Sequence, residues 1–466
     1  MKKRLIVSLM VLAVLFGFVS CSKKTQTTAT PVAPQSSAVP AQKVAEKPVA
    51  APAPAPAKSE KITLTLWNSS QTMVDWYNAS VIPEFLKQNP DVGKVDILYM
   101  PIQDFTKKLA VVLPAGDVPD IMEIEDSWAT PYVTAGYFDK NTPELDNILS
   151  QMLPEFQGNL TYNGKHYGVP VAPFHELFFY NLDMMKEAGI TAIPDTMDEV
   201  IQDAIKMTKT DENGKITRSG FSMRLGGNPS GTCQKFWVLG LLPNGVDIYE
   251  ESKKTPGKYH CGFDNEGGYA ALKLYIDMLY KYKVDDFASM KDTAAFAKEK
   301  TAINMREASS SNSIIAQGPN VNWISAPMPK GAKQRATFLI SLNLYVPKDG
   351  KHKDLARKFI ALATSREMQA IQVKERAGYN PYKDANKTEG LDPRLVPSFQ
   401  TPSDMHVYTV PVQNSYDQIQ TKIGELLPNI FAKKELLDNP EGIKQEIHNL
   451  AKIVNDVYKE NDEYGE

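Results

Sequence analysis

Residues 61–88 read KITLTLWNSSQTMVDWYNASVIPEFLKQ and hold a strand-like segment, a polar turn and a helix-like segment in succession. Ile62, Leu64 and Leu66 alternate with their neighbours, which is typical of a half-buried strand. Apolar residues then recur at helical spacing from 74 to 88. The polar residues 68–71 lie between them, where open α/β sheets bind ligands beyond the carboxyl ends of their strands. This stretch predicts an α/β fold with a binding site at strand ends.

Strand-like and helix-like segments keep alternating along the rest of the chain. Thr196 and Glu199 form a capping-box pattern that opens a helix, and further helices are predicted at residues 269–279 and 355–362. This order predicts an α/β protein with largely parallel sheets and shows no internal repeat. The other predicted strands lie at residues 95–100, from 121 onward, 220–223, 301–305 and 337–346.

Composition and charge exclude several classes of protein. The 466 residues are 42% hydrophobic and 23% charged, unlike a disordered, collagen-like or multi-span membrane chain. The net charge of -3 supplies no field that would attract nucleic acid. The sequence lacks GxSxG, HExxH, P-loop and strand-associated GxGxxG motifs, and its six histidines are scattered. We therefore predict a protein that is not an enzyme and has no metal site or cofactor, although its many carboxylates leave a glycosidase pair open.

The start of the chain is typical of an export signal. Lys2, Lys3 and Arg4 precede an apolar run at residues 5–19 that is too short to span a bilayer, which predicts a signal peptide at residues 1–20. Residues 18–21, Phe-Val-Ser-Cys, resemble a bacterial lipobox in which Cys21 is lipidated, with Phe18 standing where Leu is usual. Ordinary secretion with an incidental cysteine is the alternative.

A segment rich in alanine and proline follows Cys21. Residues 25–57 contain ten Ala, seven Pro and no aromatic residue, too little apolar surface to offset the entropy cost of ordering. We predict a disordered tether at residues 21–59. Since residues 1–20 carry three positive charges and no negative ones, their removal changes the net charge from -3 to -6.

The remaining 407 residues, 60–466, are too many for one hydrophobic core, so two lobes are expected. Two cysteines remain in this body, Cys233 and Cys261. An oxidising compartment would allow a disulfide between them, and two buried free thiols are the alternative.

Several segments of this body resemble the extracellular solute-binding proteins of bacterial ABC importers, in the large class that includes maltose-binding protein. They are AGDVPDI at 115–121, GKHYGVP at 164–170, SREMQ at 365–369 and GYNP at 378–381. The resemblance implies a two-lobed periplasmic-binding-protein-like fold, with hinge crossings near residues 171–174, 338–342 and 378–381. It implies that lobe 1 comprises residues 60–172 and 339–379, and lobe 2 residues 173–338 and 380–466.

The resemblance also implies a function. We expect a lipid-anchored monomeric receptor that captures a small polar solute, in particular a mono- or oligosaccharide, and delivers it to the permease subunits of an ABC transporter. It would be exported and held at the periplasmic or extracellular face of a membrane, with no nucleic-acid partner. A carbohydrate-active enzyme on a lipoprotein platform and a surface adhesin are the alternatives.

Ligand-binding residues are expected at strand ends and crossings, where aromatic faces and planar polar groups suit a sugar. One departure concerns residues 306–309, Arg-Glu-Ala-Ser, where sugar binders often carry a stacking Trp. Arg306 and Glu307 would suit a charged or strongly polar ligand, or form a solvated loop pair. The residues expected to contact the ligand are Asn68, Ser69, Ser70, Gln71, Asp126, Trp128, Phe174, His175, Glu176, Arg224, Trp237, Asn343, Tyr379, Asn380 and Tyr416.

Overall fold

The computed structural model describes residues 61–466. The predicted signal peptide, Cys21 and the predicted tether lie outside this range. Among residues 61–466, no helix is both long enough and apolar enough to cross a bilayer.

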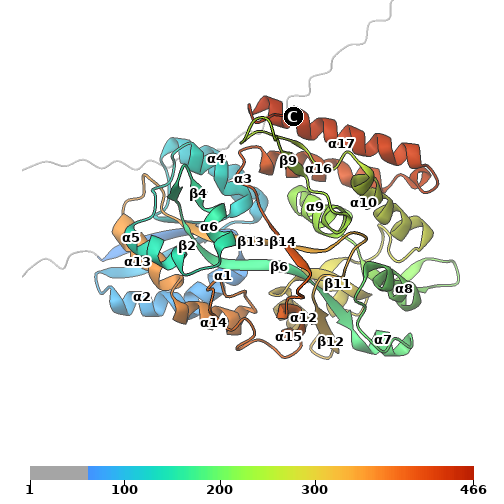
Figure 1. Cartoon of the computed structure of the whole chain (residues 1–466). Helices are drawn as coiled ribbons and strands as arrows, with labels where there is room; N and C mark the ends of the chain where they lie inside the picture. The colour runs from blue at the N-terminus through green and yellow to red at the C-terminus, as the bar shows by residue number, and fades with distance from the viewer. Residues whose placement is uncertain (1–60) are drawn as a thin grey trace, which may run out of the picture. The chain divides into compact units, whose positions relative to one another are not determined.

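One mixed sheet runs through the described part of the chain (Figure 1). Its main path, in spatial order, is β2 (Val92–Tyr99), β1 (Ile62–Asn68), β3 (Ile121–Glu125), β13 (Arg335–Tyr345), β6 (Val169–Asn181), β11 (Thr301–Glu307), β8 (Ile216–Ser222) and β7 (Lys209–Thr210). Off this path, β12 (Trp323–Ala326) pairs with β6 and β14 (Met405–Thr409) pairs with β13. Two small hairpins are formed by β4 (Thr161–Tyr162) with β5 (Lys165–His166), and by β9 (Tyr249–Glu251) with β10 (Tyr259–Cys261).

The prediction of largely parallel sheets holds only locally. β1 is parallel to β2 and β3, β8 is parallel to β11, and β14 is parallel to β13. The two longest strands, β6 and β13, are antiparallel to each other. In addition, β6 pairs antiparallel with β11 and β12, and β13 pairs antiparallel with β3. Sequence alternation cannot show this, since buried parallel and antiparallel strands are both runs of apolar residues.

Helices cover the sheet. The predicted helix at residues 74–88 is present as α1 (Gln71–Trp76), a π-helical turn at 77–81 and α2 (Ile82–Gln88). The predicted capping box is also present: the Thr196 hydroxyl accepts from the Glu199 amide at 3.3 Å, and the Glu199 carboxylate accepts from the Thr196 amide at 2.9 Å. The other α-helices are α3 (Ile102–Ala115), α4 (Asp126–Thr134), α5 (Pro143–Ser150), α6 (Pro154–Asn159), α7 (Leu182–Glu187), α8 (Met197–Met207), α9 (Pro229–Phe236), α10 (Glu266–Ile276), α11 (Asp292–Ala297), α12 (Ser310–Gln317), α13 (Lys353–Ala363), α14 (Arg366–Arg376), α15 (Val396–Phe399), α16 (Tyr416–Phe431) and α17 (Pro440–Glu460).

The buried apolar side chains form three clusters. The first core is built from β1–β3, α1–α6 and α13, and the second core from α7–α10, β8, β11, α16 and α17. A smaller third core gathers Phe179, Phe296, Trp323, Leu395 and Phe399. Each core excludes water from its own set of helices, which is the expected solution for a body too large for one core.

Two strands contribute to both large cores. β6 places Val171 in the first core and Phe178 in the second, and β13 places Leu344 in the first and Phe338 in the second. The two strands pair with each other between these points, from Ile340 opposite Phe174 to Leu344 opposite Val169. Figure 1 shows β6 crossing the middle of the molecule, from the side of α1 and α13 to the side of α7. The backbone that links the cores is therefore a paired ribbon.

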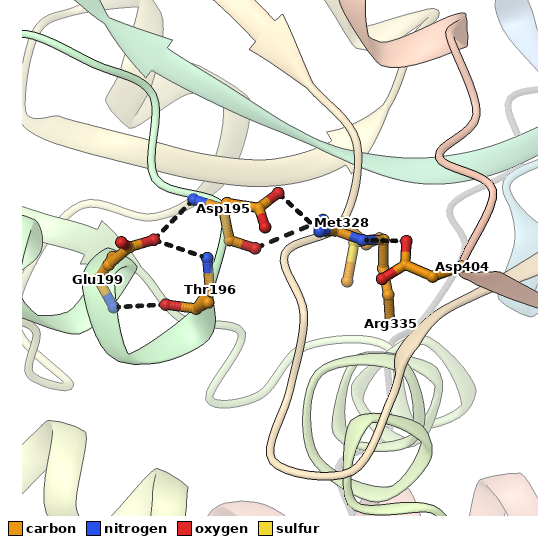
Figure 2. A network of polar contacts seen from close by, with 6 residues as sticks. All are labelled: Asp195, Thr196, Glu199, Met328, Arg335 and Asp404. Atoms are coloured by element: carbon orange, nitrogen blue, oxygen red, sulfur yellow. Dashed lines mark hydrogen bonds and ion pairs between the residues drawn. The ribbon is translucent and has the colours of Figure 1, made fainter.

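The start of β13 is fixed by a polar network (Figure 2). Arg335 is 6% exposed, and its guanidinium contacts the Asp404 carboxylate at 3.0 Å and the Asp195 carboxylate at 2.6 Å. The same guanidinium donates to the Met328 carbonyl at 2.9 Å. One side chain thus ties the loops before α8 and β14 to the strand, and the two carboxylates compensate its burial.

The two cysteines are free thiols in the structure, so the disulfide is not formed and the alternative holds. Both side chains are buried in the second core, Cys233 on α9 and Cys261 on β10. Burial raises the pKa of the Cys261 thiol to about 12, and that of Cys233 is also raised. Each thiol packs as a small apolar side chain and is not a reactive thiolate.

Candidate functional site: a cleft between the cores

A cavity of about 670 Å³ opens where elements of the three cores meet. Its floor is the segment 172–176 of β6 together with Leu342 of β13, and residues 172–174 of this segment belong to the paired ribbon that links the cores. Strand ends, helix starts and the turn at residues 376–379 surround it. Concave sites with aromatic faces and a few convergent polar groups are where small ligands bind.

Aromatic rings gather at one end of the floor. The His175 ring contacts Tyr379 edge to face at a centroid distance of 5.4 Å and Phe399 at 5.1 Å. Tyr379 and Phe399 stack at 6.0 Å. Burial lowers the pKa of His175 to about 4, so its ring is neutral at pH 7. His175 therefore adds uncharged ring surface to this end of the cavity, and Lys387 Nζ lies 5.0 Å from the Tyr379 ring centroid.

The wall that belongs to the first core carries mostly neutral side chains, with Arg376 and Glu125 as its charged residues. It carries Ser69, Ser70 and Thr72 after β1, Ile102 at the start of α3, and Trp128 on α4. The turn is held from behind, because the Asn68 side chain accepts from the Ser70 amide at 2.6 Å and donates to Glu123 at 2.7 Å. Asn68 is fully buried and directs the serines into the cavity without lining it.

Glu125 is the carboxylate of this wall, at the end of β3. It accepts from the Ser127 hydroxyl at 2.5 Å and from the Gln234 amide at 3.3 Å. Burial raises its pKa to about 7 despite these hydrogen bonds. Since Gln234 belongs to α9, the second bond joins the two walls across the cleft.

The wall that belongs to the second core is rich in charge. Helix α9 begins at Pro229 because the Asn228 side chain caps it, and its next turns direct Gln234 and Lys235 to the cavity. Lys235 forms an ion pair with Glu176 in which both side chains are less than 10% exposed. Such a pair is stable only because each charge compensates the other.

Arg306 and Glu307 continue this wall. β11 extends through Glu307, so both residues belong to the strand and are not the loop pair considered from the sequence. The Arg306 guanidinium contacts the Glu307 carboxylate at 3.0 Å and the Asp292 carboxylate at 3.2 Å. Burial alone would favour the neutral form of the Glu307 carboxyl, but the charges of Arg306 and then Lys235 lower the pKa of Glu307 to about 2. These groups stay ionised and line the cavity.

The structure brings eight of the fifteen predicted ligand residues to this cavity. They are Ser69, Ser70, Trp128, Phe174, His175, Glu176, Arg224 and Tyr379. The seven that do not line it are Asn68, Gln71, Asp126, Trp237, Asn343, Asn380 and Tyr416.

The seven have other structural partners. Trp237 is fully buried, stacks on Phe338 at 5.2 Å and donates to Asp247 at 2.8 Å, with Tyr416 beside it in the second core. Asp126 accepts from Asn159 at 3.1 Å inside the first core.

Three others form hydrogen bonds with residues close to them in sequence. Asn343 donates to the Ser341 carbonyl at 3.3 Å, and Asn380 accepts from the Tyr382 amide at 3.1 Å. Gln71 is exposed and donates to Asp75 at 2.9 Å.

Sequence reasoning missed cavity residues that lie on helices or directly before them. They include Thr72, Asn228, Gln234, Lys235, Asp292, Ser310, Gln317 and Arg376. A polar residue on a helix faces solvent in most cases, so no local signal marks these positions. Asn228 is the exception, since its place before Pro229 predicts a helix start beside the predicted residue Arg224.

Comparison with known proteins gives the class. The sequence profile of the bacterial extracellular solute-binding proteins matches residues 70–370, and the chain belongs to this family. It is therefore an exported binding protein with the two-lobed α/β fold predicted from the sequence. Among the described residues, no group of His, Cys, Asp or Glu is placed to hold a metal ion.

Three relatives illustrate the similarity. The diacetylchitobiose binding protein DasA of Streptomyces coelicolor is 24% identical, over 69% of this chain and 74% of its own. The arabinooligosaccharide-binding protein of Bacillus subtilis is 24% identical, over 70% of this chain and 74% of its own. An ABC transporter solute binding protein from Thermotoga lettingae, solved with alpha-D-tagatose bound, is 25% identical with a TM-score of 0.71, over 84% of this chain and 99% of that one.

Proposed function

We propose that the protein captures an oligosaccharide in the cleft and delivers it to the permease of an ABC transporter. The observation that carries the proposal is the cavity of about 670 Å³ that combines aromatic faces with hydroxyl and amide groups between two cores. The names of its relatives, which bind diacetylchitobiose and arabinooligosaccharides, support a saccharide as solute. The Thermotoga neighbour, an ABC transporter binding protein with a bound sugar, supports the transporter partner.

The cavity offers both kinds of contact that a sugar needs. Trp128, Phe174 and Tyr379 present ring surface to the apolar faces of pyranose rings. Ser69, Ser70 and the amides of Asn228 and Gln234 can exchange hydrogen bonds with hydroxyl groups. With contacts on both walls, a ligand binds more tightly when the walls approach each other, which is the condition for ligand-driven closure.

In this proposal the lobes correspond to the two large cores. Residues 60–172 with 339–379 form lobe 1, and residues 173–338 with 380–466 form lobe 2. The membership of the cores supports the first two boundaries, because β6 and β13 each change core within the predicted crossings, whereas Tyr382, beyond the third boundary, still packs in the first core. The chain acts by binding and release and not as an enzyme.

The function is tested by isothermal titration calorimetry of residues 60–466 against neutral and acidic di- and trisaccharides of several configurations. We expect at least one to bind with a dissociation constant in the micromolar range, and Trp128→Ala to weaken it. Trp67→Ala is the matched control, because Trp67 lies outside the cavity beneath Lys108. Failure of every saccharide to bind more tightly than about 1 mM would refute the proposal.

Absence of catalysis is tested on the same complexes. Incubation of the bound oligosaccharide with the protein should leave it intact by chromatography. Product formation that disappears in Glu125→Gln would instead favour a carbohydrate-active enzyme, since Glu125 is a carboxylate of the cleft whose pKa is about 7.

We also propose that the mature protein is anchored through a lipid on Cys21, within the Phe-Val-Ser-Cys segment at 18–21. Expression of the full chain with radiolabelled palmitate should label the protein, and Cys21→Ser should abolish both the label and membrane fractionation. A labelled Cys21→Ser variant, or wild-type protein released without detergent, would contradict the anchor.

A further inference from the structure

A second cavity, of about 430 Å³, adjoins the cleft on the side of the second core. The two cavities share four lining residues: Arg224, Lys235, Asp292 and Arg306. The second cavity continues past them to Met223, Tyr275 and Asn304. The cleft is therefore extended at one end, and charged side chains stand at the junction.

Three of the cations that line the two cavities on this side already have carboxylate partners. Lys235 is paired with Glu176, and Arg306 with both Glu307 and Asp292. Lys291, deeper in the second cavity, contacts the buried Asp285 carboxylate at 2.6 Å. Their charges are satisfied within the protein.

Arg224 is different. Within residues 61–466 it forms no ion pair, and its Nε atom is buried without a hydrogen-bond partner. Burial, and then the neighbouring Arg306, lower the pKa of its guanidinium, which is the signature of a desolvated cation near a like charge. An uncompensated charge in this position destabilises the protein unless an anion arrives.

Two glycines leave room for the Arg224 guanidinium. A Cβ placed on Gly231 would lie 3.0 Å from Arg224 Nη2, and one placed on Gly227 would lie 3.5 Å from it. The two glycines thus leave space for the side chain against the start of α9. The N-terminus of a helix carries partial positive charge. Two independent sources of positive potential therefore meet at the junction of the cavities.

We propose that the solute is an acidic oligosaccharide, one that carries a uronic acid carboxylate, and that Arg224 binds this carboxylate at the junction of the two cavities. The inference rests on the proposed function and narrows its substrate class. A carboxylate fits better than a phosphate, because Arg224 is the one cation shared by the two cavities that has no ion pair within residues 61–466, and Asp292 stands beside it. A monoanion balances one guanidinium, whereas a dianion would be repelled by the nearby carboxylates.

The test compares uronic acid disaccharides of gluco, galacto and manno configuration with their methyl esters, which keep the shape and lose the charge. Calorimetry should show one acid binding about 10- to 100-fold more tightly than its ester. Arg224→Gln should remove that preference, and Arg224→Lys should keep part of it. Gly231→Ala, which crowds the guanidinium and keeps its charge, should reduce the preference severalfold.

Arg218→Gln is the matched control, because Arg218 lies on β8, the strand that precedes Arg224, is paired with Glu187 at 2.7 Å and lines neither cavity. It should leave the preference unchanged. Equal binding of acid and ester, a preference that survives Arg224→Gln, loss of preference in Arg218→Gln, or tighter binding of a sugar phosphate would each overturn the inference. Binding of neutral oligosaccharides alone would overturn it and leave the proposed function standing, whereas failure of all saccharides would refute the proposed function itself.

Discussion

The two walls of the cleft differ in the kind of polar side chain that they present to the cavity. The wall of the first core presents Ser69, Ser70 and Trp128, neutral groups that lose little when the cavity holds only water. The wall of the second core presents ionised side chains, which must be compensated within the protein whether or not a ligand is bound. The difference indicates that the first wall contributes mainly to affinity, while the second contributes to affinity and to the stability of the fold.

Among the substitutions that test this difference between the walls, removal of Lys235 should change the stability of the protein most. Lys235→Met leaves the Glu176 carboxylate buried without its cation, and we expect a loss of about 3–5 kcal/mol in the free energy of unfolding. Urea denaturation monitored by tryptophan fluorescence measures it. The double variant Lys235→Met with Glu176→Gln removes both charges and should recover most of the loss. If Lys235→Met alone were as stable as the wild type, the ion pair would not be what compensates the burial of the Glu176 carboxylate.

The carboxylate of the first wall, Glu125, should make the stability of the protein depend on pH. Burial raises its pKa in the folded state to about 7 from the ordinary 4.5, so folding favours the protonated carboxyl. Its contribution to stability is therefore fully present below pH 4.5 and is lost as the pH rises through about 7. Glu125→Gln should match the wild type in acid and exceed it by about 1–3 kcal/mol at pH 8.

Urea denaturation at a series of pH values measures this window. Glu199→Gln is the control, because Glu199 is exposed and backbone hydrogen bonds lower its pKa, so its variant should show no gain as the pH rises. A stability difference between Glu125→Gln and wild type that does not change from pH 4.5 to 8 would contradict the assignment.

The smallest effect should come from a hydroxyl of the neutral wall. Ser70→Ala removes one hydrogen-bonding group from the cavity and should weaken saccharide binding about fivefold, which corresponds to about 1 kcal/mol. Because Ser70 contacts only Thr72 through its side chain, at 3.2 Å, the unfolding free energy should stay within about 0.5 kcal/mol of the wild type. Calorimetry and denaturation on the same sample separate the two effects, and a large loss of stability would refute the contrast between the walls.

Local signals predicted much of the fold. The strand at residues 62–67, the helix at 74–88 and the capping box at Thr196 are present, because alternation, helical spacing and capping depend on neighbours in sequence. The antiparallel pairing of β6 and β13 depends on residues more than 150 positions apart and leaves no local trace.

The site was predictable where a polar residue directly follows a strand, as for Ser69, Ser70 and Arg224. It was not predictable on helices, where Gln234 and Lys235 have the pattern of surface residues. Aromatic residues were predicted with mixed outcome, because Trp237 and Trp128 both suit stacking and packing, and only the tertiary structure places Trp237 in the core and Trp128 in the cavity.

The position of the cavity floor has a mechanical consequence. Rotation of one core relative to the other about the β6–β13 ribbon would displace each atom in proportion to its distance from that axis. Residues 172–174 belong to this ribbon, so their contacts to a solute would have nearly the same length at every angle and would not favour one angle over another. Trp128 on α4 and Arg224 after β8 lie off the ribbon, on opposite walls of the cleft. Contacts of the solute with Trp128 and Arg224 would therefore favour one angle between the cores over the others. Contacts with the floor would hold the solute in place at every angle.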